Sequence, residues 1–411
     1  MRSPLPLLLM LALAACSDQL TSLPQYDSGE NSKALALAAP GERVNLISTS
    51  STWSQQITGV NSRGALYAMF VPQNWNGDVV YYAHGIVDAA LPIALPDGDG
   101  FPDVRDALGT LGYAVAYSSF SENGWAEKDG VFSTHQLREL FTRTVGQPGR
   151  SYLMGTSMGG LVAENIAEKY PTQYNGTLAM CAPLGGAIEE VNYIANARVL
   201  FDVFYPGVLP GDVIHVPAGL DLNTQVLGPA QAAIINDPNG LGAIARIKQT
   251  PLAGTNGPEL VGSLLYALAY DVRGIDDFLG RTNGHNMFEN STTKYEAAAP
   301  GLLPPTVLAY VNAVAGRFHA TPDAINYLTQ YYVPSGKVQQ PVITLHTTQD
   351  PLVPFTHEGS FARKTATAGS SANVLQRSIA RYGHCAFTTQ EMVDAFQSLT
   401  GWATTGQRPA N

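Results

Sequence analysis

A serine in a glycine-rich turn is the residue of this sequence best suited to nucleophilic chemistry. Gly155-Thr-Ser-Met-Gly159 is a G-x-S-x-G pentapeptide, and it places Ser157 between a predicted strand over 150–154 and a predicted helix over 161–170. A strand that turns directly into a helix around a serine lifts the hydroxyl off the sheet. Only glycines at the flanking positions let strand and helix approach so closely. We therefore predict that Ser157 is a nucleophile.

A serine of this kind needs a base, and the base needs a carboxylate. Serine alone is a weak nucleophile at neutral pH, and histidine is the usual base because its pKa lies near the working pH. A carboxylate then holds the imidazole in the correct tautomer. Asp350 and His384 each lie in a loop after a predicted strand, over 341–346 and 374–380. The chain thus supplies Ser157, Asp350 and His384 in that order.

A second loop is placed to stabilise negative charge. His84-Gly85-Ile86 follows a short apolar strand over 79–83. Acyl transfer needs a backbone N–H aimed at the developing oxyanion, and a glycine allows the close approach. The alternative is a plain turn at the end of a strand. We favour the functional interpretation because Ser157 follows downstream.

The surrounding pattern predicts the elements that must position these residues. Antiparallel opening strands over 43–75 precede an alternation of strands and helices from 79 to 182. This alternation predicts a parallel, doubly wound α/β sheet with helices on both faces. Residues 187–338 are mostly helical. The strands of the sheet then resume, and a last predicted helix follows them over 388–399. We therefore predict three parts, which are a first core part (43–186), a helical cap over the active-site face (187–338) and a second core part (339–411). The alternative for 187–338 is an independent domain with no role at the site.

Four pieces of the sequence together resemble α/β-hydrolases, particularly secreted or envelope serine esterases. They are His84-Gly85, Gly155 to Gly159, Asp350-Pro-Leu-Val-Pro354 and Gly383-His384-Cys385, within residues of about 64–186 and 339–411. The resemblance implies the α/β-hydrolase fold with a large helical insertion. It also implies a Ser-His-Asp triad without a cofactor, in which His384 is general base and acid and Asp350 orients it.

The same resemblance implies an oxyanion hole and a pocket rim. The backbone N–H groups of Met158 and Ile86 would form the hole, with Gly85 as the alternative to Ile86. Trp125 follows the strand that ends near Ser118. Trp125 would line the substrate pocket together with His84, or it would anchor a structural loop.

The N-terminus has the pattern of a targeting segment. Arg2 precedes an apolar stretch, and Leu13-Ala-Ala-Cys16 resembles the bacterial lipobox, in which the cysteine is lipidated. We predict a signal peptide over 1–15, a lipid anchor on Cys16 and a tether over 16–42. An ordinary signal peptide is the alternative. The expected location is the bacterial cell envelope, at the outer membrane or periplasm of a Gram-negative host, or outside the cell.

Two further cysteines, Cys181 and Cys385, would then lie in an oxidising compartment and are a candidate disulfide. The His384-Cys385 pair also resembles feruloyl esterases and tannases, in which a cysteine before the nucleophile pairs with the one after the histidine. Thr156 stands before Ser157 here, so the sequence departs from that pattern. Cys181, after the neighbouring strand, would be the partner in its place. The alternative is two buried thiols.

Composition and the remaining motifs narrow the classes of partner. The net charge of −10 argues against nucleic acid. Asp97, Asp99 and Asp103 have a faint calcium-loop spacing, but the other ligands are missing, and we interpret them as a solvated turn. His346, four residues before Asp350 at a strand end, is expected to be a packed or hydrogen-bonded residue. No metal motif occurs, so neither a metal nor a cofactor is predicted.

We therefore predict a serine hydrolase that cleaves carboxylic esters of small molecules or polymers. A serine peptidase of the same fold is the nearest alternative, and it would need acidic residues in the cap, such as Asp271, Asp276 or Asp277. A non-catalytic binding lipoprotein is the third hypothesis. The oligomeric state stays open.

Overall fold

The computed structural model describes residues 43–46, 52–96 and 100–410 of the chain. The predicted signal peptide, Cys16 and the tether over 16–42 lie outside the described residues, as do Asp97 and Asp99.

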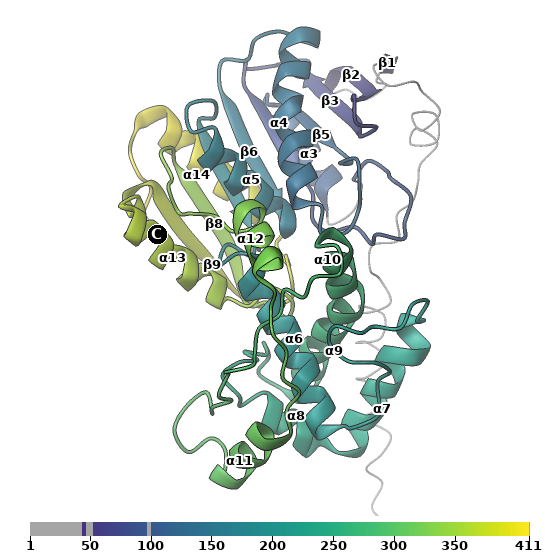
Figure 1. The fold of residues 1–411 in the computed structure, drawn as a ribbon. Helices are drawn as coiled ribbons and strands as arrows, with labels where there is room; N and C mark the ends of the chain where they lie inside the picture. Colours follow the sequence, from purple (N-terminus) through teal and green to yellow (C-terminus); the bar gives the residue numbers. More distant parts are fainter. Residues whose placement is uncertain (1–42, 47–51, 97–99, 411) are drawn as a thin grey trace, which may run out of the picture.

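A nine-stranded sheet in the order β1-β2-β3-β5-β4-β6-β7-β8-β9 forms the centre of the described chain (Figure 1). The strands are β1 (Arg43–Leu46), β2 (Trp53–Val60), β3 (Leu66–Pro72), β4 (Val79–Ala83), β5 (Ala114–Ser118), β6 (Ser151–Thr156), β7 (Gly176–Met180), β8 (Val342–Gln349) and β9 (Val374–Tyr382). The pairings among β1, β2, β3 and β5 are antiparallel, and every pairing from β5 through β9 is parallel. The predicted mixed sheet is confirmed.

The parallel part of the sheet brings the predicted chemistry to one edge. In parallel strands the carboxyl ends meet on the same side, and functional loops gather there. β4 pairs with β6, β6 with β7, β7 with β8 and β8 with β9. The loops after these strands carry His84 to Ile86, Ser157, Cys181, Asp350 and His384.

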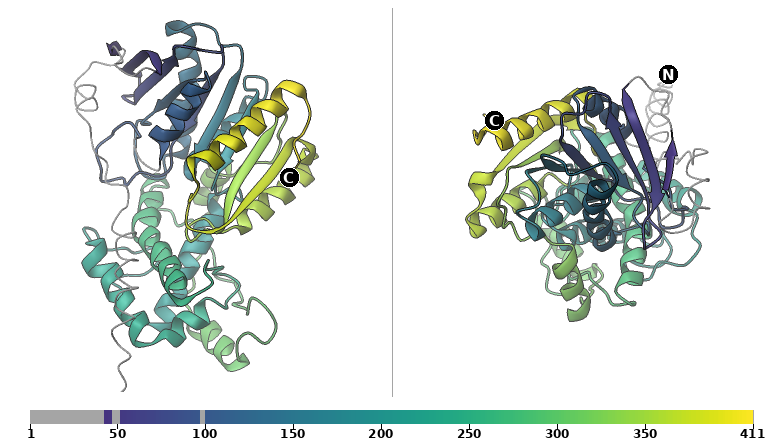
Figure 2. Two further views of the ribbon diagram at one scale, coloured as in Figure 1. Left: turned by 180° about the vertical axis from the view of Figure 1, so that it is seen from behind. Right: turned by 90° about the horizontal axis from the view of Figure 1, so that it is seen from above.

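Helices cover both faces of the sheet, because successive side chains of each strand point to opposite sides. Val80 and Tyr82 of β4 pack in one apolar cluster with α3 (Phe101–Thr110) and α14 (Thr389–Thr405). Val79 and Tyr81 pack in another cluster with α4 (Glu127–Thr144) and α5 (Met158–Lys169). Figure 2 shows the two helical layers on either side of the twisted sheet. All four of these β4 side chains are buried, which explains the unbroken apolar run of that strand.

The helices between β7 and β8 form a separate group at one edge of the sheet (Figure 1). They are α6 (Ala187–Phe204), η1 (Leu222–Leu227), α7 (Gly228–Asn236), α8 (Pro238–Ile244), α9 (Gly257–Tyr270), η2 (Asp271–Ile275), α10 (Asp276–Arg281), α11 (Pro305–Val314) and α12 (Pro322–Tyr331). The short α8, α10 and the two π-helical turns η1 and η2 have no separate signal in the sequence. In the described part of the chain, no helix is both long and apolar enough to cross a membrane.

The final helix differs from its predicted bounds. The sequence predicts its end at Leu399, but α14 continues to Thr405, and Trp402 inside it is 6% exposed. The start agrees, because the Thr388 hydroxyl accepts a hydrogen bond from the Glu391 N–H while the Glu391 carboxylate accepts one from the Thr388 N–H. The extra turn and a half continue the apolar face that covers the sheet.

Candidate active site

The backbone at Ser157 has the strained geometry that the G-x-S-x-G pattern predicts. Ser157 has φ 55° and ψ −129° and lies between the last residue of β6 and the first of α5. A Cβ atom on Gly155 would lie 2.1 Å from the carbonyl oxygen of Gly159, and one on Gly159 would lie 2.1 Å from that of Ala83. No side chain fits at either position, so the two glycines are steric requirements of this turn.

Ser157, His384 and Asp350 form a continuous chain of hydrogen bonds. His384 Nε2 lies 2.9 Å from Ser157 Oγ, and His384 Nδ1 lies 2.9 and 3.0 Å from the two carboxylate oxygens of Asp350. Since the carboxylate can only accept, Nδ1 carries the proton and Nε2 accepts from the serine hydroxyl. The structure therefore brings together three residues that are far apart in the sequence, in the orientation needed for proton transfer from serine to histidine.

The surroundings of Asp350 hold its carboxylate in the ionised form. Its Oδ1 atom accepts hydrogen bonds from the backbone N–H groups of Leu352 and Val353, both at 2.9 Å. Burial would raise the pKa of Asp350, but the neighbouring His384 and His346 hold it well below its usual range. The carboxylate is thus an anion with a fixed orientation.

A second histidine, His346 of β8, also contacts Asp350. Its Nε2 atom lies 3.5 Å from Asp350 Oδ2 and donates to the carbonyl of Val353 at 3.0 Å, and its Nδ1 atom lies 3.3 Å from Glu358 of α13 (Thr356–Ala368). Burial would lower the pKa of His346, but the carboxylates of Asp350 and Glu358 raise it to about 10. The expectation of a packed or hydrogen-bonded residue agrees with these contacts, but it did not name Asp350 and Glu358 as the partners.

Another buried histidine, His357, joins α13 to the first inserted helix. Its Nδ1 atom accepts from the Gly185 N–H at 3.0 Å, so the Nε2 proton is donated to Glu190 of α6 at 2.9 Å. Burial lowers the pKa of His357 to about 4 and raises that of Glu190 well above its usual value. We therefore describe this contact as a hydrogen bond between neutral groups and not as an ion pair.

The loop after β4 lies against the serine. A Cβ atom on Gly85 would be 3.2 Å from Ser157 Cβ and 3.7 Å from its Oγ. Among the described residues, no acceptor takes the N–H groups of Gly85 and Ile86. Met158 is the first residue of α5, where a helix leaves its N–H unpaired. Three candidate oxyanion donors therefore surround the serine turn.

The side chains of His84 and Trp125, the two residues predicted at the substrate pocket, are packed. The His84 ring is 5% exposed and stacks on Phe120 at 3.9 Å between centroids, while its Nδ1 donates to the Gly85 carbonyl at 2.7 Å. Burial lowers its pKa to about 4. Trp125 is 3% exposed and stacks on Phe278 of α10 at 4.7 Å. Of the two interpretations of Trp125, the anchor of a structural loop agrees with this position.

The inserted helices hold the loop of Trp125. The Asp277 carboxylate of α10 accepts from the Trp125 N–H at 2.7 Å, and Arg281 donates to the Asn123 carbonyl at 2.6 Å. The Tyr332 hydroxyl, just after α12, donates to the Trp125 carbonyl at 2.9 Å. These contacts fix α10 and α12 to the edge of the sheet at which Ser157 lies.

Inserted residues also hold the loops that carry Asp350 and His384. The Tyr193 hydroxyl of α6 donates to the carbonyl of Pro351 at 3.1 Å. The Gly254 N–H donates to the side chain of Gln349 at 2.8 Å, and the Tyr382 hydroxyl donates to the Glu259 carbonyl at 3.0 Å. The insertion therefore supports the carboxylate and histidine loops directly.

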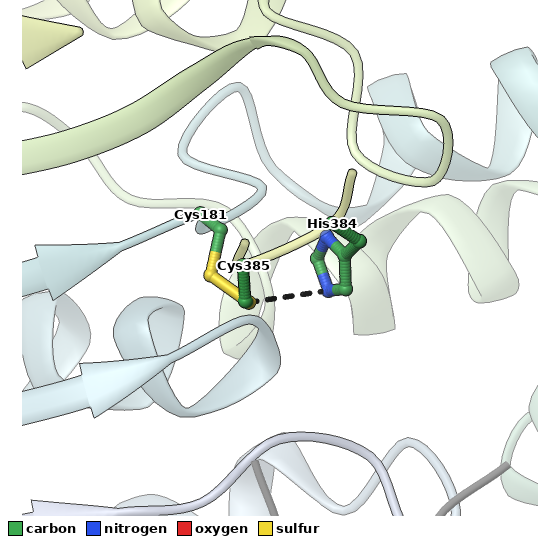
Figure 3. Close-up of side chains that lie close together, drawn as sticks. All are labelled: Cys181, His384 and Cys385. Carbon is green, nitrogen blue, oxygen red and sulfur yellow. Dashed lines mark hydrogen bonds between the residues drawn. A yellow bond between two sulfur atoms is a disulfide. The ribbon is translucent and has the colours of Figure 1, made fainter. Parts of the chain in front are cut away.

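Cys181 and Cys385 are joined by a disulfide beside His384 (Figure 3). Both cysteines have positive φ angles, of 45° and 50°. Cys385 Sγ lies 3.5 Å from His384 Nε2, and the two sulfurs with His384 place atoms of metal-ligand type within 4.8 Å of one another. Because the sulfurs bond to each other and Nε2 faces Ser157, this group is suited to holding the histidine and not to binding a metal ion.

Comparison with known proteins finds esterases, at low similarity. No family model matches the chain. A probable feruloyl esterase B-2 of Aspergillus flavus is 26% identical over 187 residues, which are 42% of this chain and 34% of that protein. The chain thus matches about a third of the length of this curated relative.

Several of the solved structures to which the chain is similar are esterases. Feruloyl esterase B from Aspergillus oryzae has a TM-score of 0.48 at 13% identity, over 86% of this chain and 81% of that chain. Another esterase from Aspergillus oryzae has a TM-score of 0.44 at 14% identity, over 90% and 86%. The strand order, the exchange of β4 and β5 within it and the serine turn after β6 show that the chain has the α/β-hydrolase fold.

Proposed function

We propose that the protein is a serine hydrolase that cleaves carboxylic esters through an acyl-enzyme. The observation that carries the proposal is the 2.9 Å contact of His384 Nε2 with Ser157 Oγ, with Asp350 on the other ring nitrogen. Nucleophile, base and orienting carboxylate thus stand in the order and geometry that acyl transfer needs. The partial similarity to a probable feruloyl esterase favours an ester as the substrate.

In the first half of the proposed reaction, Ser157 Oγ attacks the ester carbonyl carbon while His384 Nε2 takes the hydroxyl proton. The oxyanion of the tetrahedral intermediate is stabilised by the N–H groups of Met158 and of Ile86 or Gly85. The carbon–oxygen bond to the alcohol then breaks, and His384 protonates the departing oxygen. Ser157 is left acylated.

Water completes the reaction. His384 takes a proton from water as the hydroxide attacks the acyl carbonyl, and it returns that proton to Ser157 Oγ when the acid leaves. Asp350 stabilises the imidazolium in both halves because it stays ionised. No cofactor is needed at any step.

A peptidase of the same fold is the second candidate, and the cap carboxylates make it less favourable. Asp271 is fully buried beside Arg198, and Asp277 binds Arg281 and the Trp125 N–H. Both carboxylates are therefore engaged in holding the structure together. A binding lipoprotein without catalysis would not require the aligned hydrogen bonds of the triad.

We also propose that residues 187–338 form a cap that sets the choice of substrate, and that Cys16 carries a lipid anchor in the cell envelope. The cap proposal rests on the contacts of α6, α10 and α12 with the loops around Ser157. The anchor proposal rests on the sequence Leu13-Ala-Ala-Cys16. Incorporation of labelled palmitate into the wild type, and its loss in Cys16→Ala, tests the anchor.

The activity is tested by a substrate panel. Purified protein is assayed on p-nitrophenyl esters of several acyl lengths, on methyl ferulate and on aminoacyl p-nitroanilides, with Ser157→Ala as the control. We expect hydrolysis of esters, abolished in Ser157→Ala. Hydrolysis of the anilides alone would establish the peptidase in place of the esterase.

A further inference from the structure

We propose that His346 is a positioning residue for the reaction, a buried cation that binds Asp350 opposite His384 and sets the basicity of His384. This inference rests on the proposed function. It goes beyond the triad because His346 does not touch the reacting atoms and acts through Asp350.

Contacts at both ring nitrogens show that His346 is a cation. The His346 side chain is fully buried, and Nε2 faces two acceptors, the Val353 carbonyl and Asp350 Oδ2. Nδ1 faces Oε1 of Glu358. A carbonyl and two carboxylates donate nothing, so each ring nitrogen must carry a proton.

The partner Glu358 is itself held as an acceptor. Its Oε2 atom takes hydrogen bonds from the Thr344 hydroxyl and the Gln376 amide, both at 2.6 Å. This leaves Oε1 for His346. The Glu358 carboxylate, with donors facing both of its oxygens, therefore pairs with the charge of His346.

The other groups that face this cluster are neutral or belong to the triad. Glu190 of α6 accepts a hydrogen bond from His357 Nε2. Burial raises the pKa of Glu190 well above its usual value. The Tyr193 hydroxyl of α6 is un-ionised because burial raises its pKa well above the usual value. The charges that matter for His384 are thus those of Asp350, His346 and Glu358.

These charges give a simple count. Asp350 and Glu358 each contribute −1 and His346 contributes +1, so His384 faces a net charge of −1. Less negative charge near an imidazole lowers its basicity. His346 therefore keeps His384 in the neutral, proton-accepting form at lower pH than Asp350 and Glu358 alone would allow.

The test is the pH dependence of kcat/KM for an ester substrate in three variants. His346→Gln leaves a net charge of −2 around His384. We therefore expect the acidic limb of the profile, over which kcat/KM rises with pH, to move to higher pH by on the order of one unit. Glu358→Gln leaves a net charge of zero, and the limb should move to lower pH. The double variant restores −1, and its limb should return to within about 0.3 units of the wild-type limb.

The two single variants are expected to shift the acidic limb of the pH profile in opposite directions. A variant that only loosened the fold would lower kcat at every pH without shifting this limb. KM should change by less than about threefold, because His346 lies outside the substrate contacts. Unmoved limbs in both single variants, or limbs that move in the same direction, would overturn the proposal. If His346→Gln does not fold, the downward shift in Glu358→Gln alone decides, and its absence rejects the proposal. Wild-type protein without ester hydrolysis would instead refute the proposed function.

Discussion

The backbone of Gly85 lies beside the side chain of Ser157, so close that a Cβ atom on Gly85 would be 3.2 Å from Ser157 Cβ. This contact places the N–H groups after β4 at the serine. The same atom would be 3.5 Å from the Thr156 carbonyl. A Cβ atom on Gly85 would therefore require the Ser157 side chain to shift by a few tenths of an ångström.

Gly85→Ala should lower kcat/KM by about 10- to 100-fold, because a small displacement of the serine or the oxyanion donors misaligns the reaction. Ester hydrolysis and thermal unfolding are the measurements. Gly401→Ala in α14 is the matched control, since a Cβ atom there meets nothing within 4 Å, and it should keep full activity. An undiminished rate in Gly85→Ala would show that this loop does not contribute to the site.

Removal of the Cys181–Cys385 disulfide should lower both stability and activity. The bond closes a loop with a sequence separation of 204 residues, for which chain entropy sets an upper limit of about 5 kcal/mol. It also attaches the loop of His384 to the end of β7. We expect a lower unfolding midpoint and a lower kcat in Cys181→Ser/Cys385→Ser. Dithiothreitol should lower the unfolding midpoint and kcat of the wild type and leave both values of the double variant unchanged. A reduced wild type with unchanged midpoint and rate would contradict this role.

The buried cation of the inserted helices is expected to be essential for their folding. Arg198, whose side chain is 1% exposed, contacts Asp202 at 2.9 Å, the fully buried Asp271 at 3.3 Å and two backbone carbonyls. Arg198→Ala would leave Asp271 buried without its partner, at a cost of about 3–5 kcal/mol.

Thermal unfolding followed by circular dichroism measures this cost. Arg143→Ala is the control, because Arg143 and Glu139 form an exposed pair at 3.5 Å and such a pair contributes less than about 1 kcal/mol. Equal midpoints for the two variants would show that the Arg198 cluster does not stabilise the inserted helices.

Stability should fall as the pH is lowered from about 6.5 to about 4. Burial lowers the pKa of His84, His135 and His357 to about 4 in the folded protein. The unfolded chain binds these protons from pH 6.5 downward, so acid favours unfolding across this window. His346 acts in the opposite direction, because its raised pKa means that its contribution is present below pH 6.5 and lost as the pH rises towards 10.

Unfolding midpoints measured at intervals between pH 4 and pH 8 test this dependence. His135→Gln removes one of the three histidines at a place away from the triad, where His135 stacks on Tyr170 at 3.6 Å. The unfolding midpoint of this variant should decrease less steeply as the pH falls than that of the wild type. A pH dependence identical to that of the wild type would mean that His135 has the same pKa in the folded and unfolded states.

The sequence predicted the residues whose chemistry depends on local context. Ser157 was identified by the glycines on either side, and Asp350 and His384 by their positions after short strands. The parallel, doubly wound part of the sheet was predicted from the alternation of strands and helices, but the order of the strands was not. These signals are local, and the structure places all of these residues at one edge of the sheet.

The rest depends on contacts between distant segments. The role of His346 requires Glu358, which comes from the following helix, and no pattern in the sequence links the two. Trp125 belongs to a loop that is polar in sequence, but its position is decided by Phe278 and Asp277 of α10 more than a hundred residues later. The bounds of α8 and α10 are equally hard to predict, since Pro and Gly interrupt their periodicity.

The proposed reaction depends on activation of Ser157 by His384. Reaction of the folded protein with a fluorophosphonate, followed by peptide mapping by mass spectrometry, measures this activation. We expect one phosphonate on Ser157, a much slower reaction in His384→Ala and none in Ser157→Ala. Folded wild-type protein in which Ser157 stays unlabelled would contradict it.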